Sequence, residues 1–296
     1  MRLAAIDIGS NTTLLLVVEK TDETFSVLED KIYFTRLAEG LSVSKKLSSG
    51  ALFRLTEAFQ SIQEILEKFR PDQISAVATS ACREAVNQEE LFQLGEKFHI
   101  SPIEIISAKR EAELTFTGAI FGLGQECEDP LVVDIGGGST ELVSCKKSYS
   151  FNMGSVTLTE KLQTAQALTR MDKISLTTYI ENTLKPVKTF LQERDYKPLI
   201  FVAGTPITLA FMEKETSDPN HVHGEKLTEE QVHFWLEKLA GLSLEERKKI
   251  PHLPEHRSDV IVAGLAILKQ ILSATGKKEF IVSATGVRYG LILEQC

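Results

Sequence analysis

The sequence predicts an α/β fold built from two related halves. Short apolar segments typical of buried strands alternate with longer amphipathic segments typical of helices, which is the pattern of an α/β protein. An apolar strand followed by Asp, Ile, Gly and hydroxyl residues occurs at Ala4–Thr12 and again at Val132–Thr140. A chain of 296 residues is long enough for two ordinary domains. The repeat therefore indicates an internal duplication, with one copy in each half.

The first half begins with three predicted strands, at 3–8, 12–19 and 24–32, separated by polar turns. Apolar residues then recur every three or four positions over 48–69, which predicts an amphipathic helix. The remaining predicted elements of this half are a strand at 74–79, helices within 80–98, a strand at 103–106 and a helix over 109–121.

The second half restarts at Leu131 with strands at 131–134, 140–144 and 148–151. Its later predicted elements are a helix around 173–193, a strand at 199–202, a helix beginning near Pro206, helices over 228–250 and 256–273, a strand at 280–282 and a final short helix. The boundary is expected within 124–130, which gives domains 1–126 and 127–296, with the option that the final helix packs back on the first domain.

Composition excludes several classes of protein. The chain is 43% hydrophobic and 25% charged, as soluble globular proteins are, and its net charge of −8 argues against broad binding to nucleic acid or to an anionic membrane. No apolar run approaches the ~20 residues that span a bilayer, and an acid at Asp7 interrupts any signal peptide. The four cysteines show no paired spacing and are expected to be reduced thiols in the cytoplasm: Cys82, Cys127, Cys145 and Cys296.

The repeated turn predicts a phosphate-binding loop. Its backbone amides and hydroxyls can donate hydrogen bonds to phosphate oxygens, and the Asp that precedes it can hold Mg²⁺ against the phosphate. Glycine is expected there because it permits positive φ and close approach to a ligand. A single copy is equally well explained as a tight hairpin, whereas two matching copies favour a shared anionic ligand between facing lobes. Neither a Walker A sequence nor a Rossmann fingerprint is present, which disfavours a dinucleotide enzyme.

Two further segments follow predicted strands. Lys109 and Arg110 begin a helix, where amides and cations make a candidate anion site. From periodicity alone, Glu111 and Glu113 are better explained as ordinary first-turn acids that stabilise the helix dipole. Arg83 lies just past a strand end, where α/β proteins carry ligands, with a solvated side chain as the alternative.

The ordered motifs resemble those of the exopolyphosphatase and guanosine pentaphosphate phosphohydrolase family, within the superfamily of actin, sugar kinases and heat-shock chaperones. The resemblance runs nearly end to end and implies two actin-like, ribonuclease H-like lobes with a central cleft, without the extra C-terminal helical domain of longer members. The matching segments are Asp7–Thr12, Thr79–Ala85, Ile106–Ser107 leading into Glu111–Ala112, Asp134–Glu141, Met153–Val156, Ala203–Thr205, Val222–Gly224, Arg257–Asp259 and Ala284–Gly290.

The resemblance also implies roles for individual residues. Glu111 aligns with the catalytic glutamate that activates the attacking water, and the acids around the Mg²⁺ are Asp7, Asp134 and Glu141. The residues expected to bind phosphate are Gly9, Ser10, Asn11, Thr12, Arg83, Gly136, Gly137, Gly138, Ser139, Thr140 and Gly204. The chain departs from the family pattern at Ala108 and Arg110, where members commonly carry Gly and an acid. Arg110 is expected either to lower the pKa of Glu111 or to contact phosphate.

The predicted function is hydrolysis of the terminal phosphoanhydride of inorganic polyphosphate. Guanosine pentaphosphate is the alternative substrate, since the same chemistry applies to it. A nucleotide-driven kinase or switch is a second class of function, and a catalytically weak sensor of polyphosphate or nucleotide is a third. Neither nucleic acid nor membrane is expected as a partner, and a homodimer is expected from the resemblance alone. The pair His221 and His223 favours a structural role over a metal site.

Overall fold

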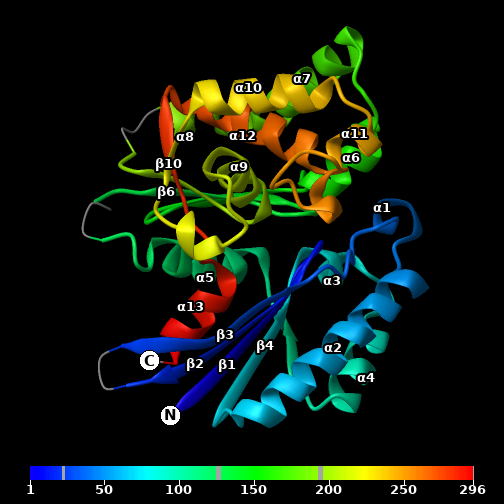
Figure 1. Ribbon diagram of the computed structural model, residues 1–296, viewed down its shortest axis with the longest axis vertical. Helices are drawn as coiled ribbons and strands as arrows, with labels where there is room; N and C mark the ends of the chain where they lie inside the picture. Colours follow the sequence, from blue (N-terminus) through cyan, green and yellow to red (C-terminus); the bar gives the residue numbers. More distant parts are fainter. Residues whose placement is uncertain (22–23, 125–127, 193–195, 296) are drawn as a thin grey trace. The chain divides into compact units, whose positions relative to one another are not determined.

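The computed structural model divides the chain into two compact units. Unit 1 comprises Met1–Gly118 and Gly286–Cys296, and unit 2 comprises Ala119–Thr285. The structure describes residues 1–21, 24–124, 128–192 and 196–295 (Figure 1). The predicted domain boundary between residues 126 and 127 lies outside the described residues, and the division between the units falls inside helix α5 (Ala108–Ile120). The chain therefore passes between the units twice.

Unit 1 contains a five-stranded sheet with the order β3-β2-β1-β4-β5. The first three strands form an antiparallel meander, and β4 and β5 continue the sheet parallel to β1. Leu3 to Ile6 of β1 are fully buried, as expected for a central strand covered on both faces. The strands are β1 (Arg2–Ile8), β2 (Thr13–Lys20), β3 (Phe25–Tyr33), β4 (Gln73–Ala78) and β5 (Ile103–Ile105).

Helices cover this sheet, with α2 and α4 on one side and α13 on the other (Figure 1). The longest helix, α2, begins where the Ser48 side chain accepts a hydrogen bond from the amide of Ala51, and it buries residues at three- and four-residue spacing. The helices of unit 1 besides α5 are α1 (Leu41–Ser44), α2 (Ser49–Phe69), α3 (Ser80–Glu84), α4 (Gln88–Lys97) and α13 (Val287–Glu294).

Unit 2 contains a six-stranded sheet with the order β10-β11-β9-β6-β7-β8. Its antiparallel meander β6-β7-β8, with the parallel strand β9 beside β6, repeats the arrangement of β1-β2-β3 with β4. The repeated topology agrees with the predicted duplication. The strands are β6 (Leu131–Ile135), β7 (Thr140–Ser144), β8 (Ser148–Phe151), β9 (Leu199–Val202), β10 (Lys226–Thr228) and β11 (Glu279–Val282).

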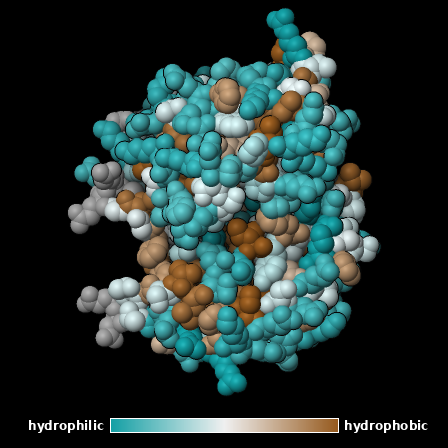
Figure 2. All heavy atoms as spheres, in the orientation of Figure 1, coloured by the Kyte–Doolittle hydropathy of each residue, from teal (hydrophilic) through white to brown (hydrophobic). Residues whose placement is uncertain are grey.

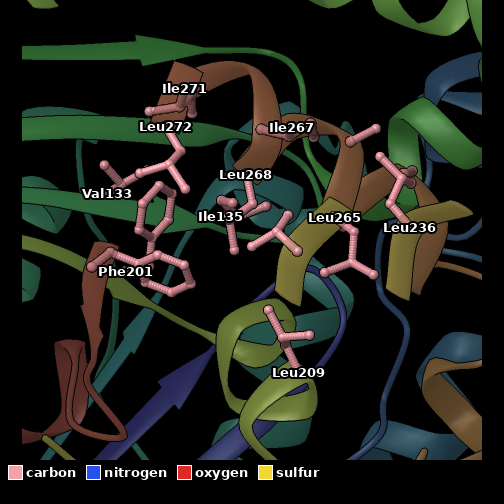
Figure 3. Packing of buried hydrophobic residues seen from close by; sticks show 14 of the residues in the cluster. Val133, Ile135, Phe201, Leu209, Leu236, Leu265, Ile267, Leu268, Ile271 and Leu272 are labelled. Atoms are coloured by element: carbon pink, nitrogen blue, oxygen red, sulfur yellow. The ribbon is translucent and has the colours of Figure 1, made fainter. Parts of the chain in front are cut away.

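The core of unit 2 is built around α12 (Ile261–Thr275), which is buried over most of its length and contacts β6 and helices on several sides. Leu268 and Leu272 of this helix belong to one cluster with Ile135 of β6 and Phe201 of β9 (Figure 3). The other helices of unit 2 are α6 (Ser155–Leu162), α7 (Arg170–Leu184), α8 (Lys188–Gln192), α9 (Gly204–Lys214), α10 (Glu229–Ala240) and α11 (Leu244–Arg247), with 3₁₀ turns at Lys185–Val187, Pro219–His221 and Glu255–Arg257.

The α/β fold predicted from the sequence is confirmed, with differences in single elements. The helix predicted over 173–193 is divided at Lys185–Val187, because Pro186 lacks the amide hydrogen that a continuous helix needs. Its predicted end at Glu193 lies outside the described residues. Helices α1 and α6 and the short strand β10 were not predicted.

The surface is polar where it can be seen. The face shown in Figure 2 is mostly hydrophilic, with hydrophobic residues in small groups. Among the described residues, no helix has the length and apolar character needed to cross a bilayer. Cys82 is a buried free thiol and Cys145 an exposed one, whereas Cys127 and Cys296 lie outside the described residues.

Candidate functional site

The two repeated turns share one hydrogen-bonding pattern. In unit 1 the amide of Gly9 donates to the carbonyl of Thr12 at 2.9 Å, and in unit 2 the amide of Gly136 donates to the carbonyl of Ser139 at 3.0 Å. Both turns connect the first two strands of a meander, and each follows a strand that carries an Asp. The sequence repeat is therefore also a repeat of local backbone structure.

In unit 1 another segment binds the carbonyls of the turn. The amides of Arg36 and Ala38 donate to the carbonyls of Asn11 and Ser10 at 3.0 and 2.9 Å. Because the C=O and N–H of one trans peptide point in opposite directions, this arrangement directs the amides of Asn11 and Thr12 away from that segment. Arg36 has φ 51°, the left-handed region that few residues other than glycine adopt.

In unit 2 the start of helix α6 has the same role. The amides of Ser155 and Val156 donate to the carbonyls of Gly136 and Gly137, both at 2.9 Å. The amides of Gly137 and Gly138 are therefore directed away from the helix, by the same peptide geometry as in unit 1. Two turns that each present successive amides on one side are suited to bind phosphate oxygens.

Glycine is required in these turns by close packing. The expectation of positive φ is wrong, because Gly9 and Gly136 to Gly138 are not among the residues with positive φ. A Cβ on Gly136 would lie 3.1 Å from the Ser139 carbonyl oxygen, and one on Gly154 would lie 2.4 Å from the Gly137 carbonyl. The carbonyl that accepts the hydrogen bond within each turn therefore leaves little room for a Cβ at Gly9 or Gly136, and close approach of α6 to the turn explains Gly154.

The first turn carries buried polar side chains that the fold does not satisfy. Ser10 is 6% exposed and Asn11 is 4% exposed. Within the described residues, the Ser10 hydroxyl and both polar atoms of the Asn11 amide have no hydrogen-bond partner. Leaving a buried polar group unsatisfied costs about 1–3 kcal/mol, which a ligand with hydrogen-bonding oxygens would relieve. Asp7 lies nearby at the end of β1 and is 9% exposed, and Thr12 is half-buried beside Asn11.

Glu111 and Arg83 form a partly buried ion pair in unit 1, with the carboxylate as the more buried partner. The Arg83 guanidinium donates from Nη1 to Oε2 of Glu111 at 2.7 Å and to the Ile106 carbonyl at 3.0 Å. Glu111 is 8% exposed, and burial raises its pKa above the usual value, while the charge and hydrogen bond of Arg83 and a hydrogen bond from Thr79 oppose that rise. A glutamate held in one orientation with a raised pKa has the properties of a general base.

The cations next to Glu111 are paired elsewhere. Arg110 forms a bidentate pair with Glu294 of α13, and Lys109 lies 3.8 Å from Glu113 in an exposed pair. Arg110 is not among the groups that shift the pKa of Glu111. The structure therefore supports neither the candidate anion site at Lys109 and Arg110 nor either effect expected of Arg110.

Unit 2 places Asp134 and Glu141 side by side. The two residues are directly paired across β6 and β7, so their side chains point to the same face of the sheet. Glu141 is 2% exposed, and two facing carboxylates repel each other unless a cation lies between or near them. In the part of the chain that the structure describes, there is no cluster of three or more His, Cys, Asp or Glu. One or two carboxylates completed by phosphate and water match the way Mg²⁺ is usually held, so the residues present fit this ion.

The second turn ends at two hydroxyl residues, Ser139 in the turn and Thr140 at the start of β7. Ser139 is 3% exposed within the turn. The Thr140 hydroxyl donates to the carbonyl of Met153 at 2.5 Å, so its proton is not available to a phosphate oxygen. The phosphate hydrogen bond expected from the Thr140 side chain is contradicted by this contact, which instead fastens β7 to the segment before α6.

Gly204 begins α9 next to a cation that sequence reasoning missed. A Cβ on Gly204 would lie 1.9 Å from the guanidinium of Arg257, so any larger residue would displace that side chain from its present position. Ala203, which precedes it, has φ 72°, a strained value for a residue with a Cβ. The one available signal was the segment Arg257–Asp259, which matches the family pattern but was given no role.

His223 has the structural role expected of it. Its Nδ1 accepts a hydrogen bond from the amide of Ala284 at 3.2 Å, and its Nε2 lies 3.1 Å from the carbonyl of Phe121. A neutral ring with the proton on Nε2 makes both bonds, and burial lowers the pKa of His223, which favours the neutral form. His221 is exposed, 3.8 Å from Asp218. The two imidazoles are used separately within unit 2.

Comparison with known proteins places this arrangement in one family. The model of the Ppx/GppA phosphatase family matches residues 16–296. The chain is 32% identical over 312 residues to a bifunctional 3-dehydroquinate synthase/phosphatase of Fusobacterium nucleatum, covering 98% of this chain and 46% of that protein, so it spans less than half of that relative. It is 27% identical over 286 residues to exopolyphosphatase 2 of Mycobacterium tuberculosis, covering 91% of this chain and 89% of that one.

Solved structures agree with this assignment of the fold. A crystal structure of the Aquifex aeolicus Ppx/GppA family member superposes with a TM-score of 0.84 at 28% identity, covering 100% of this chain and 97% of the other. An exopolyphosphatase structure from Cytophaga hutchinsonii gives a TM-score of 0.92 at 23% identity over 100% of this chain and 97% of the other, which bears on the fold alone.

Proposed function

The chain belongs to the Ppx/GppA phosphatase family, and on that premise we propose that it hydrolyses the terminal phosphoanhydride of inorganic polyphosphate. The mycobacterial relative named exopolyphosphatase 2, which matches over most of both chains, supports polyphosphate as the substrate. Guanosine pentaphosphate contains the same anhydride bond and is the second substrate to test. The free thiols Cys82 and Cys145 support a cytoplasmic location, and a homodimer belongs to the proposal by resemblance only.

The observation that carries the proposal is the pairing of the buried Glu111 with Arg83. Glu111 would accept a proton from the attacking water, whose oxygen bonds to the terminal phosphorus while the bridging P–O bond breaks. The products are orthophosphate and a polyphosphate shortened by one unit. Arg83 holds one oxygen of the base in place, at 2.7 Å, and offers its other N–H groups to a phosphate. A positioned base contributes roughly 10²- to 10⁴-fold in rate.

The two turns would bind the anionic substrate and its metal. In unit 1 the amides of Asn11 and Thr12 with the unsatisfied side chains of Ser10 and Asn11 support a role in phosphate binding. In unit 2 we assign the same role to the amides of Gly137 and Gly138, to Ser139 and to Gly204. In unit 2, Asp134 and Glu141 would hold Mg²⁺. In unit 1, Asp7 is the other acid proposed for metal binding. When bound, Mg²⁺ would neutralise charge on the phosphate oxygens.

The deciding experiment measures phosphate release from long-chain polyphosphate and from guanosine pentaphosphate, with Mg²⁺ or with EDTA. Wild type is compared with Glu111→Gln, which preserves shape but cannot act as a base. Glu113→Gln is the matched control, because Glu113 lies on the same helix and is more than half exposed. We expect Mg²⁺-dependent release from polyphosphate that falls at least 100-fold in Glu111→Gln and is unchanged in Glu113→Gln.

Other outcomes redirect the assignment. Release from guanosine pentaphosphate alone would replace the substrate while keeping the chemistry. Transfer of phosphate from ATP without hydrolysis of polyphosphate would indicate a kinase or switch instead. Tight binding of polyphosphate without release would indicate a sensor.

A further inference from the structure

Glu141 receives a hydrogen bond from a residue that no sequence motif singled out. The hydroxyl of Ser150 donates to Oε1 of Glu141 at 2.7 Å. Ser150 lies on β8 and Glu141 on β7, and the two are directly paired in the antiparallel ladder. The contact therefore follows from strand register, and it lies entirely within unit 2.

This contact extends the row of polar residues across the sheet. Asp134 of β6 is paired with Glu141, which is in turn paired with Ser150. Residues paired in this way place their Cβ atoms about 4.5–5.5 Å apart on the same face of the sheet. One hydroxyl and two carboxylates thus lie in line across three adjacent strands, with Ser150 on the edge strand.

A hydroxyl is well suited to orient a carboxylate that binds a cation. Glu141 has three rotatable side-chain bonds, and a hydrogen bond to a charged acceptor is strong enough to hold one rotamer. Lys or Arg at position 150 would hold it too, but would cancel the negative charge that attracts a metal. Ser150 is neutral, so it fixes one oxygen and leaves the net charge of the carboxylate pair unchanged.

We propose that Ser150 is a positioning residue that holds Glu141 in the rotamer needed to bind a divalent cation beside Asp134. The inference rests on the proposed metal-dependent function, because Glu141, the residue that Ser150 orients, is one of the acids proposed to bind the metal. It adds a residue outside the turn to the groups that determine metal affinity. The chemistry of the reaction is unchanged by it.

The test compares two substitutions at this position with a control on the same strand. Ser150→Ala removes the hydroxyl, and Ser150→Thr keeps a hydroxyl on a residue that strands favour. Ser148→Ala is the control, because Ser148 lies on the same face of β8, is exposed, and is paired with Val143 instead of an acid. Mn²⁺ is the probe, titrated into each purified protein without substrate and followed by electron paramagnetic resonance.

We expect Ser150→Ala to weaken Mn²⁺ binding by about 10- to 100-fold, the usual effect of losing a hydrogen bond to a metal ligand. Ser150→Thr should bind within about threefold of wild type, and Ser148→Ala should equal wild type. With polyphosphate as substrate, the Mg²⁺ concentration for half-maximal rate should rise in Ser150→Ala, while kcat at saturating Mg²⁺ stays near the wild-type value. A higher Mg²⁺ requirement with an unchanged kcat is not expected if Ser150 only stabilises the fold.

Mn²⁺ affinity equal in wild type and Ser150→Ala overturns the inference, and so does wild-type protein that binds no Mn²⁺. A loss in Ser150→Ala that Ser150→Thr does not restore also overturns it, provided that both variants give the circular dichroism spectrum of wild type. Mn²⁺ binding that depends on Ser150 in a protein that releases no phosphate from either substrate would leave the inference standing and overturn the proposed function instead.

Discussion

At the scale of single residues, burial and one guanidinium act in opposite directions on the protonation of the proposed base. Burial raises the pKa of Glu111, and Arg83 and Thr79 oppose the rise. As the base, Glu111 must be ionised, so activity should increase with pH as this carboxyl loses its proton. The acid limb of the pH profile is therefore set by the balance between burial and the contact with Arg83.

Arg83→Gln should move this acid limb to higher pH. Without the Arg83 charge, burial is opposed only by Thr79, so the pKa of Glu111 rises further and the base remains protonated at a pH where wild type is active. The profile of kcat/KM against pH, measured on whichever substrate is hydrolysed, checks this shift. We expect part of the lost activity to return at alkaline pH.

Arg110→Gln is the matched control for this prediction. Arg110 is adjacent to Glu111 in sequence, yet it pairs with Glu294, so its loss should leave the acid limb where it is in wild type. A loss of activity in Arg83→Gln that is equal at every pH would contradict the pairing role and indicate that Arg83 acts only as a phosphate contact.

Sequence could identify the candidate base but not its partner. Glu111 occupies a position in an ordered set of motifs, so resemblance was enough to single it out. Its contact with Arg83 joins residues that are far apart in the chain, and the Ser150–Glu141 contact depends on the register of two strands. Contacts of this kind are produced by tertiary packing, which no local spacing encodes. The same holds for Arg257 against Gly204.

At the scale of elements, the second turn and the start of helix α6 are held together by backbone contacts. The start of the helix donates to the carbonyls of Gly136 and Gly137, and Gly154 lies directly against Gly137. The direction of the turn amides therefore depends on how closely the helix approaches. A side chain at position 154 would therefore push the helix away from the turn.

Gly154→Ala should destabilise the protein by about 1–3 kcal/mol, because the new Cβ would lie 2.4 Å from the Gly137 carbonyl and the backbone would have to move. Urea unfolding monitored by circular dichroism measures the change in the free energy of unfolding. Gly50→Ala is the control, since its Cβ would contact only Arg54 at 3.6 Å inside α2, where alanine is the better helix former. Equal stability of wild type and Gly154→Ala would show that the contact is not tight in solution.

Elements with strong local patterns could be predicted, and elements held by distant partners could not. The apolar runs of β1 and β6 and the amphipathic helix α2 are visible in the sequence because burial determines their residues. Helix α6 is short, and its local signal is limited to the Thr157 hydroxyl, which accepts a hydrogen bond from the amide of Gly154. Its first amides are satisfied by the turn of another segment. Strand β10 has three residues and exists through its pairing with β11, far along the chain.

At the scale of the whole molecule, the chain leaves unit 1 at α5 and returns to it at α13. Arg288 of α13 donates to both carboxylate oxygens of Asp30 on β3, at 3.0 and 2.9 Å, and Tyr289 donates to the same carboxylate at 3.2 Å. The Arg288 side chain is buried, whereas the Asp30 side chain is 27% exposed, so the pair is partly buried. Close backbone contacts of Gly118 with Gly286, and of Gly290 with Leu114, join α13 to α5. The sequence repeat indicated two halves and left the packing of the last helix on the first half as an option, which the contacts of α13 bear out.

Arg288→Gln should destabilise unit 1 and leave unit 2 nearly unaffected. Hydrogen bonds to a charged group typically contribute about 1.5–3 kcal/mol, and the Asp30 carboxylate left behind is partly solvated. Hydrogen exchange measured by mass spectrometry should accelerate in β1, β2 and β3 and remain as in wild type in β6 and β9. Lys31→Gln is the control, because it removes an exposed pair with Glu29 on the same strand as Asp30. Equal acceleration in both units would indicate that they unfold together.

The return of α13 to unit 1 has a consequence for the order of events during synthesis. Domains of a nascent chain generally fold from the N-terminus onward as they leave the ribosome. Here all of unit 2, from Ala119 to Thr285, is synthesised before the segment that completes unit 1. The unit that begins the chain is therefore the last to be complete. Until α13 emerges, the nascent chain must carry a sheet whose strand β1 lacks the helix that covers it.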